Sequence, residues 1–111
     1  MAYDKQLASR VETILISHNP TNMSELKMFG GVCYLMRGNI ACGVLDDKLI
    51  VRVGKPSYEN ALAKPGTAPF DTTGRPMSGW VFVKHSAVES DSSLRAWVQQ
   101  GVEFALTLPA K

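Results

Sequence analysis

The stretch that decides the fold is KMFGGVCYLMRGNIACGVLDDKLIVRV, residues 27–53. It contains three apolar runs, Met28–Met36, Ile40–Leu45 and Leu49–Val53, separated by RGN and DDK. Short separators that carry glycine or aspartate between β-rich runs are typical of hairpin turns. The stretch therefore predicts a three-stranded antiparallel meander.

The third predicted strand has two different sides, because side chains alternate along a strand. The purely apolar side carries Leu49, Val51 and Val53, and the mixed side carries Lys48, Ile50 and Arg52. We expect the mixed side to face outward.

The adjacent glycines at 30 and 31 interrupt the first run and allow three interpretations. A phosphate-binding loop needs G-x-x-x-x-G-K-[ST] or G-x-G-x-x-G ahead of a helix, and neither spacing is present. Lys27–Tyr34 matches several positions of the RRM signature for RNA binding, but Phe29 and Tyr34 would face opposite sides of a regular strand. We therefore expect a bend or bulge within a strand, which turns the residues before it toward a different environment.

Hydrophobic periodicity and turn residues predict three helices and two further strands around the meander. Apolar side chains at helical spacing from Tyr3 to Leu15 indicate a first helix, which Asn19-Pro20 ends. A polar connection, Thr21–Glu25, follows it. The elements expected after the meander are a short helix beginning near Pro56 and stopped by Pro65-Gly66, two short strands of which the second is Trp80–His85, and a helix from Ser90 or Asp91 to Pro109.

The resulting order is α-β-β-β-α-β-β-α. It predicts an α+β fold, a two-layer sandwich with helices on one face of an antiparallel sheet. A chain of 111 residues fits one domain, so we expect residues 1–111 to form a single unit.

Composition and charge exclude several classes of protein. The net charge is only +2 and the basic residues are dispersed along the chain, whereas DNA-coating domains gather them on one face. No window approaches the ~20 apolar residues of a membrane span, and the N-terminus does not have the pattern of a signal peptide. We therefore expect a cytoplasmic protein that does not bind membranes, and direct binding to nucleic acid is disfavoured.

The sequence offers little catalytic or metal-binding chemistry. It contains no C-x-x-C, G-x-S-x-G or H-E-x-x-H pattern, so we expect no enzyme, metal or cofactor. The nearest approach to a catalytic base is His85, with Glu89 and Asp91 close by in sequence. Cys33 and Cys42 are predicted to share one face of the meander as buried thiols, with a redox pair as the alternative.

The sheet side that the helices leave uncovered is the candidate interaction surface. Exposed apolar patches above a few hundred Å² usually mark interfaces, and two-fold homodimers are the commonest assembly. We expect a homodimer or a protein partner to bind this side or an adjoining strand edge. The candidate residues are Met28, Phe29, Lys48, Ile50, Arg52, Trp80 and Phe82.

The order and spacing of several motifs resemble the TfoX N-terminal domain, the first half of the Sxy/TfoX regulators of natural competence. The motifs are MFGG, GNIACGVLDDKLIVRVG, YENALAKPG, PFDTTGRPMSGWVFV and WVQQGVEFALTLPAK. The resemblance implies an α-β3-α-β2-α fold akin to the secretion-chaperone type. It also implies transcriptional regulation, because the two-domain relatives act as co-activators with the cyclic-AMP receptor protein. No catalytic or cofactor-binding residues come with the family.

Three functional hypotheses follow. The first is a non-enzymatic protein-interaction module with a regulatory or co-activator role. The alternatives are a direct DNA-binding regulator and a small thiol or redox protein, or enzyme, that uses Cys33 and Cys42.

Overall fold

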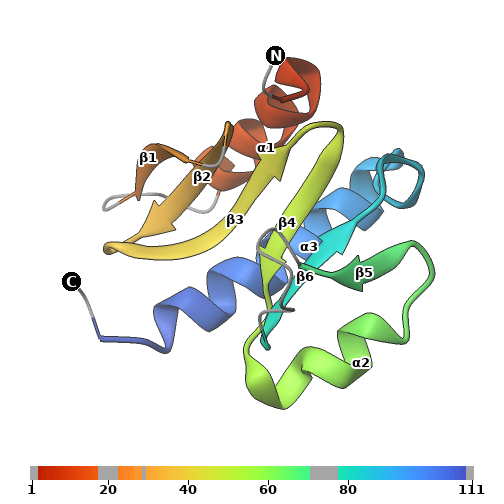
Figure 1. Cartoon of the computed structure of the whole chain (residues 1–111). Coiled ribbons are helices and arrows are strands. Elements are labelled where there is room, and N and C mark those ends of the chain that lie inside the picture. Colours follow the sequence, from red (N-terminus) through yellow and green to blue (C-terminus); the bar gives the residue numbers. More distant parts are fainter. Residues whose placement is uncertain (1–2, 18–22, 29, 71–77, 110–111) are drawn as a thin grey trace.

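A computed structural model describes residues 3–17, 23–28, 30–70 and 78–109. Figure 1 shows the chain folding into helices packed on an open sheet, which agrees with the predicted α+β class. The elements are α1 (Lys5–Ser17), β1 (Met23–Met28), β2 (Gly31–Met36), β3 (Asn39–Leu45), β4 (Lys48–Arg52), the 3-10 turn η1 (Lys55–Ser57), α2 (Tyr58–Leu62), β5 (Thr67–Pro69), β6 (Trp80–Val83), the 3-10 turn η2 (His85–Ala87) and α3 (Asp91–Leu106).

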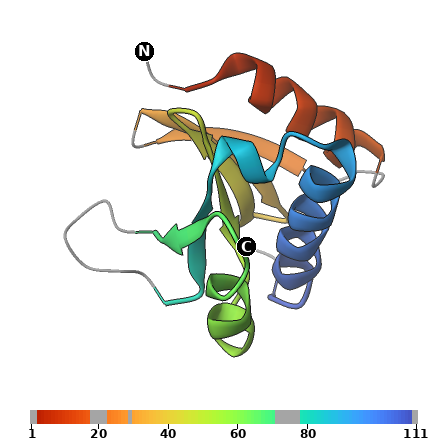
Figure 2. The ribbon, with the colours of Figure 1, turned by 90° about the vertical axis from the view of Figure 1, so that its right-hand side faces the viewer.

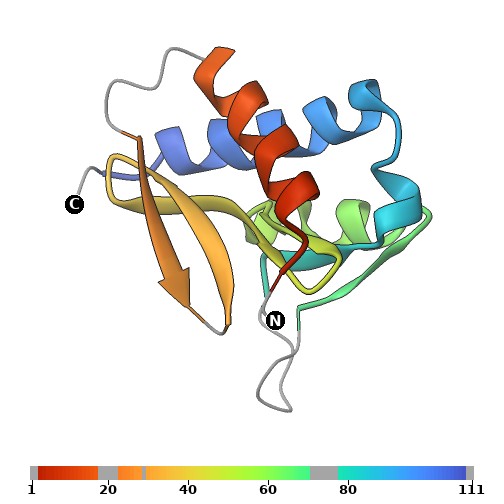
Figure 3. The same ribbon diagram turned by 90° about the horizontal axis from the view of Figure 1, so that it is seen from above.

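The sheet has six described strands in the order β1-β2-β3-β4-β6-β5, and each neighbouring pair is antiparallel. Helices α1 and α3 lie over one face of this sheet, as Figures 2 and 3 show. Helix α2 packs beside β5 and β6, and it adds Ala61 to the same core. The two-layer arrangement is therefore the predicted one.

The core lies between the sheet and helices α1 and α3. Two cross-strand rows of side chains from β2, β3, β4 and β6 form its floor, and apolar residues of the two helices cover it. The rows are Val32, Val44, Leu49 and Val83, and Tyr34, Cys42, Val51 and Val81; each of these residues is at most 1% exposed. Leu49, Val51 and Val53 thus face inward, as the sequence predicts.

Helix α3 begins where the sequence places it. The Ser90 side chain accepts a hydrogen bond of 3.2 Å from the Ser93 backbone N–H, which satisfies one of the free amides of the first helical turn. In the described part of the chain, no helix combines the length and the apolar character needed to cross a membrane.

The first β-hairpin differs from the prediction. Residues 23–25 were expected in a polar connection and Met28–Met36 in one interrupted strand, whereas Met23–Met28 forms a separate strand that pairs with β2. Gly30 has a φ of 77° in the intervening turn, a conformation that glycine adopts without steric cost. A Cβ on Gly31 would meet the backbone carbonyl oxygen of Val44. The glycines therefore form a reversal of the chain, not a bend within one strand.

A bulge in the β2–β3 ladder corrects the prediction for the cysteines. The register shifts between Tyr34 and Leu35, so that Tyr34 pairs with Cys42 instead of Ala41. One extra residue on β3 inverts the facing of all residues beyond it. Cys42 consequently lies in the core between sheet and helices, while Cys33 pairs with Gly43 and faces the other side. The two cysteines do not share a face.

Candidate functional site

Four of the predicted surface residues come together on β4 and β6. Ile50 pairs with Phe82, and Arg52 pairs with Trp80, so their side chains project from the outer face of the sheet, opposite α1 and α3. Lys48 lies on the same strand as Ile50 and Arg52, at the opposite end from Arg52.

The other two predicted residues lie elsewhere or cannot be placed. Met28 ends the edge strand β1 and is separated from β4 by two strands, a distance of about 14 Å at ordinary strand spacing. Phe29 lies outside the described residues. The structure therefore does not bring Met28 to the surface formed by β4 and β6.

The outer face carries an apolar layer of its own. Phe70 packs against Trp80 and Phe82, with ring centroids 5.8 Å and 5.0 Å away, and Phe70 itself is 1% exposed. Ile50 is only 2% exposed, so it supports this layer and is not accessible to a partner. Trp80, Phe82 and Arg52 are half-buried, so each keeps part of its surface accessible to a partner.

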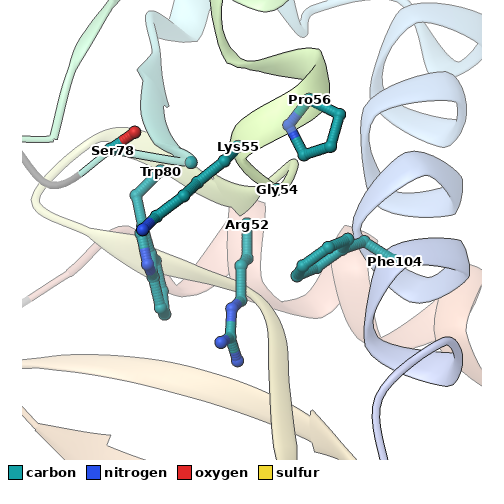
Figure 4. A pocket seen from close by; sticks show the side chains of 8 residues that line it. Arg52, Gly54, Lys55, Pro56, Ser78, Trp80 and Phe104 are labelled. Atoms are coloured by element: carbon teal, nitrogen blue, oxygen red, sulfur yellow. The ribbon is translucent and has the colours of Figure 1, made fainter.

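A pocket of about 300 Å³ opens at the end of β4 and is the candidate functional site. Its walls come from three segments far apart in sequence, as Figure 4 shows. The lining residues are Arg52, Gly54, Lys55, Pro56, Ser78, Gly79, Trp80 and Phe104. The volume is at the lower end of the range for small-ligand pockets and also suits one side chain of a partner protein.

Arg52 is the centre of this pocket and lies between two aromatic rings (Figure 4). Its guanidinium carbon is 5.2 Å from the centroid of the Trp80 ring and 5.4 Å from that of Phe104. Both distances are within the range of a cation–π interaction. The rings therefore orient the guanidinium and shield it from water without neutralising its charge.

The pocket is electropositive. Lys55 supplies a second cation, and its side chain extends toward Trp80 in Figure 4. Aspartate and glutamate do not contribute to the lining, and within the described ranges neither Arg52 nor Lys55 forms an ion pair. Two uncompensated cations beside an aromatic wall match an anionic group, and a guanidinium binds a carboxylate or phosphate through two parallel hydrogen bonds.

Gly54 allows the pocket walls to approach each other. Its φ is 87°, and a Cβ at this position would meet the Phe104 ring. The amides of Val53 and Gly54 both donate to the Gly79 carbonyl oxygen, at 2.8 and 3.0 Å. This double hydrogen bond fixes the end of β4 against the residue that precedes β6, and so it holds Arg52 beside Trp80.

The two cysteines lack the features of a reactive pair. Burial raises the pKa of the Cys33 thiol, and burial followed by the charge of Cys33 raises the pKa of Cys42 to about 12. Reactive cysteines instead have lowered pKa values and partial exposure. Both are buried, as predicted, but their burial and their opposite facing disfavour the thiol-redox hypothesis.

A second, more polar pocket of about 310 Å³ contains His85. His85 forms an ion pair with Asp4, with His85 Nε2 and Asp4 Oδ2 3.8 Å apart. Its partner is therefore not Glu89 or Asp91, the two acids that lie close to it in sequence. The other Asp4 oxygen accepts hydrogen bonds from the Gln6 and Leu7 amides, which caps α1. Asp4 therefore serves to cap α1, and its contact with His85 does not indicate a catalytic base.

Arg10 lines the same pocket and has a structural role. Its guanidinium donates to the Val88 and Glu89 carbonyl oxygens, both at 3.0 Å, and to Asp91 at 3.2 Å. It thereby ties α1 to the start of α3. Within residues 3–17, 23–28, 30–70 and 78–109, no three His, Cys, Asp or Glu side chains gather as metal ligands would.

Comparison with known proteins points to a family. The family model of the TfoX N-terminal domain matches residues 18–105, which include all six described strands of the sheet and the residues that line the pocket. No curated protein and no solved structure shows a significant similarity to the chain.

Proposed function

The chain belongs to the TfoX N-terminal domain family, and on that premise we propose that it is a non-catalytic regulatory module that binds a protein partner through the Arg52 pocket. The family suggests a role related to competence regulation. The partner supplies an acidic side chain or a terminal carboxylate, which Arg52 and Lys55 receive.

One observation carries this proposal: the guanidinium of Arg52 is oriented by two rings and has no carboxylate partner among the described residues. A half-buried charge that is held in place but not neutralised favours an anion from outside. Arginine and aromatic residues in pockets are also the residue types that dominate binding energy at protein interfaces. Trp80 and Phe82 extend the apolar contact area beside the charge.

Direct DNA binding is the second candidate, because Arg52, Lys55 and Lys48 all lie along or just after β4. This is a small basic group, and two acids, Asp46 and Asp47, precede it. Duplex binding usually requires several phosphate contacts, which give a steep dependence on salt. The protein-partner hypothesis therefore has the stronger support.

The proposal is tested by quantitative affinity capture from native lysate with three forms of the chain. The forms are the native protein, Arg52→Gln, and Lys64→Gln as a matched control. Lys64 also lies over a tryptophan, 4.8 Å from the Trp97 ring centroid, but outside the pocket. We expect a protein that the native and Lys64→Gln forms retain and that Arg52→Gln loses.

Both variants should remain folded, because Arg52→Gln removes two cation–π contacts and Lys64→Gln removes one, each worth only about 0.5–1 kcal/mol at an incompletely buried site. Equal retention of all captured proteins by Arg52→Gln would contradict the proposal.

Titration of a labelled duplex at low and high salt separates the second candidate. We expect no binding at physiological salt. Tight binding with a steep salt slope, weakened by Arg52→Gln and Lys55→Gln, would favour the DNA-binding regulator instead.

A further inference from the structure

The strand β1 forms one edge of the described sheet. It pairs with β2 on one side, and on its other side the described residues provide no strand (Figures 1 and 3). Its central residues, Ser24 to Lys27, are exposed. An unpaired edge of this kind is a template for another strand.

The two edges of the sheet differ in how they are protected. The opposite edge, β5, spans only Thr67–Pro69 and contains a proline, and both shortness and proline discourage pairing. Strand β1 has six residues, no proline and a continuous register with β2. Of these two edges of the described sheet, β1 is therefore the one that presents a regular edge to another chain.

The side chains of β1 carry a pattern that selects its partner. Leu26 lies opposite Cys33 on the outer face and is 47% exposed. Glu25 and Lys27 lie opposite the core residues Tyr34 and Val32, and so they share the helix-covered side. Both are exposed and form no ion pair within the described chain.

We propose that two copies of this chain form a two-fold homodimer by antiparallel pairing of β1 with β1, with Leu26 opposite Leu26 of the second copy. This register places Glu25 opposite Lys27 of the second copy, and two-fold symmetry repeats that pair on the other side of the axis. Each copy thus supplies one acid and one base to two identical cross-strand ion pairs, flanking an apolar contact at the axis.

Other symmetric registers are disfavoured by the same residues. If the two-fold axis passes through residue 25, Glu25 lies opposite Glu25 of the second copy. If it passes through residue 27, Lys27 lies opposite Lys27. Like charges directly opposite each other destabilise a strand pair. A register with the axis between Glu25 and Leu26 is excluded, because it would set a residue of one sheet face opposite a residue of the other, whereas directly opposite residues share a face. The sequence of β1 therefore favours one register with its own copy.

Charge reversal tests this interface with a built-in rescue. Glu25→Lys alone sets lysines against lysines, and Lys27→Glu alone sets glutamates against glutamates, so each variant should raise the dimer dissociation constant at least tenfold. An equimolar mixture of the two variants restores complementary pairs and should form a heterodimer of native affinity. Sedimentation velocity from 1 to 200 μM measures all three, and circular dichroism checks that the variants are folded.

Disulfide trapping tests the register. In the proposed pairing, the Cα atoms of residue 26 in the two copies are about 5 Å apart, within the range for a disulfide. The residue 24 positions are separated by four residues along the strand and by one strand spacing, about 14 Å in total, which is too far. Oxidised Leu26→Cys should therefore form a covalent dimer, and oxidised Ser24→Cys should remain monomeric.

Two results would overturn the inference. One is a native chain that stays monomeric at 200 μM. The other is a dimer that both charge reversals leave intact and Arg52→Gln dissociates, which would place the interface at the pocket. Because Arg52→Gln leaves β1 unchanged, failure of this inference and failure of the proposed function give different results.

Discussion

The chemistry of Cys42 and Cys33 depends on the environment of each side chain. Cys42 is fully buried between sheet and helices, and Cys33 is 3% exposed on the other side of the sheet. The residue types alone allow a redox pair, but the bulge beyond Tyr34 separates the two thiols onto opposite faces. Their chemistry is that of small apolar core residues.

The burial of Cys42 makes the free energy of unfolding depend on pH in the alkaline range. Burial raises the pKa of Cys42 from the ordinary value of 9.0 to about 12. As pH rises above 9, the unfolded chain loses this proton while the folded chain keeps it, so ionisation favours unfolding. The free energy of unfolding should fall by on the order of 1 kcal/mol per pH unit between pH 9 and 10.

Urea titrations at pH 7, 8, 9 and 10 measure this fall. The double variant Cys33→Ala/Cys42→Ala removes both buried thiols, and so its stability should change less over the same range. The range stops at pH 10 because burial and a hydrogen bond to Glu12 also raise the pKa of Tyr34 above its ordinary value of 10.0. An identical slope for the native and double-variant proteins would contradict the burial account.

At the scale of elements, the hairpin of β1 and β2 sets the limit of sequence-based prediction. Strands β2, β3 and β4 were predicted because β-rich apolar runs alternate with turn residues. Strand β1, MSELKM, lacks β-branched and aromatic residues, and its residues 24–27 are exposed, so that this part of the strand is held by pairing with β2. Edge strands of this composition cannot be distinguished from polar connections by pattern alone.

The two glycines beside this hairpin should respond differently to substitution. A Cβ on Gly30 meets no atom within 4 Å, so Gly30→Ala adds only the cost of positive φ, about 1–2 kcal/mol. A Cβ on Gly31 meets the Val44 backbone, so Gly31→Ala must also displace β2 from β3 and should cost more. Thermal unfolding of both variants measures the difference. Equal stability of Gly31→Ala and the native chain would show that β2 and β3 are not closely apposed there.

At the scale of the whole molecule, the fold class and family were predictable and the pocket was not. The order of motifs predicted the two-layer α+β arrangement, and Arg52 and Trp80 were both among the candidates for the uncovered side of the sheet; that they are neighbours is seen only in the structure. Phe104 and Gly54 were not predicted as pocket residues. Phe104 is far from Gly54 in the sequence, and its approach to Gly54 depends on how α3 packs. The one usable signal was the basic pair Arg52 and Lys55, close in sequence at the end of a strand.

The central claim is that the chain regulates through the Arg52 pocket, and transcript abundance tests it most directly. The gene is deleted and complemented with the native chain, Arg52→Gln or Lys64→Gln at equal protein levels. We expect deletion to change a defined set of transcripts, the native and Lys64→Gln forms to restore it, and Arg52→Gln to fail. Unchanged transcripts on deletion, or full restoration by Arg52→Gln, would contradict the claim.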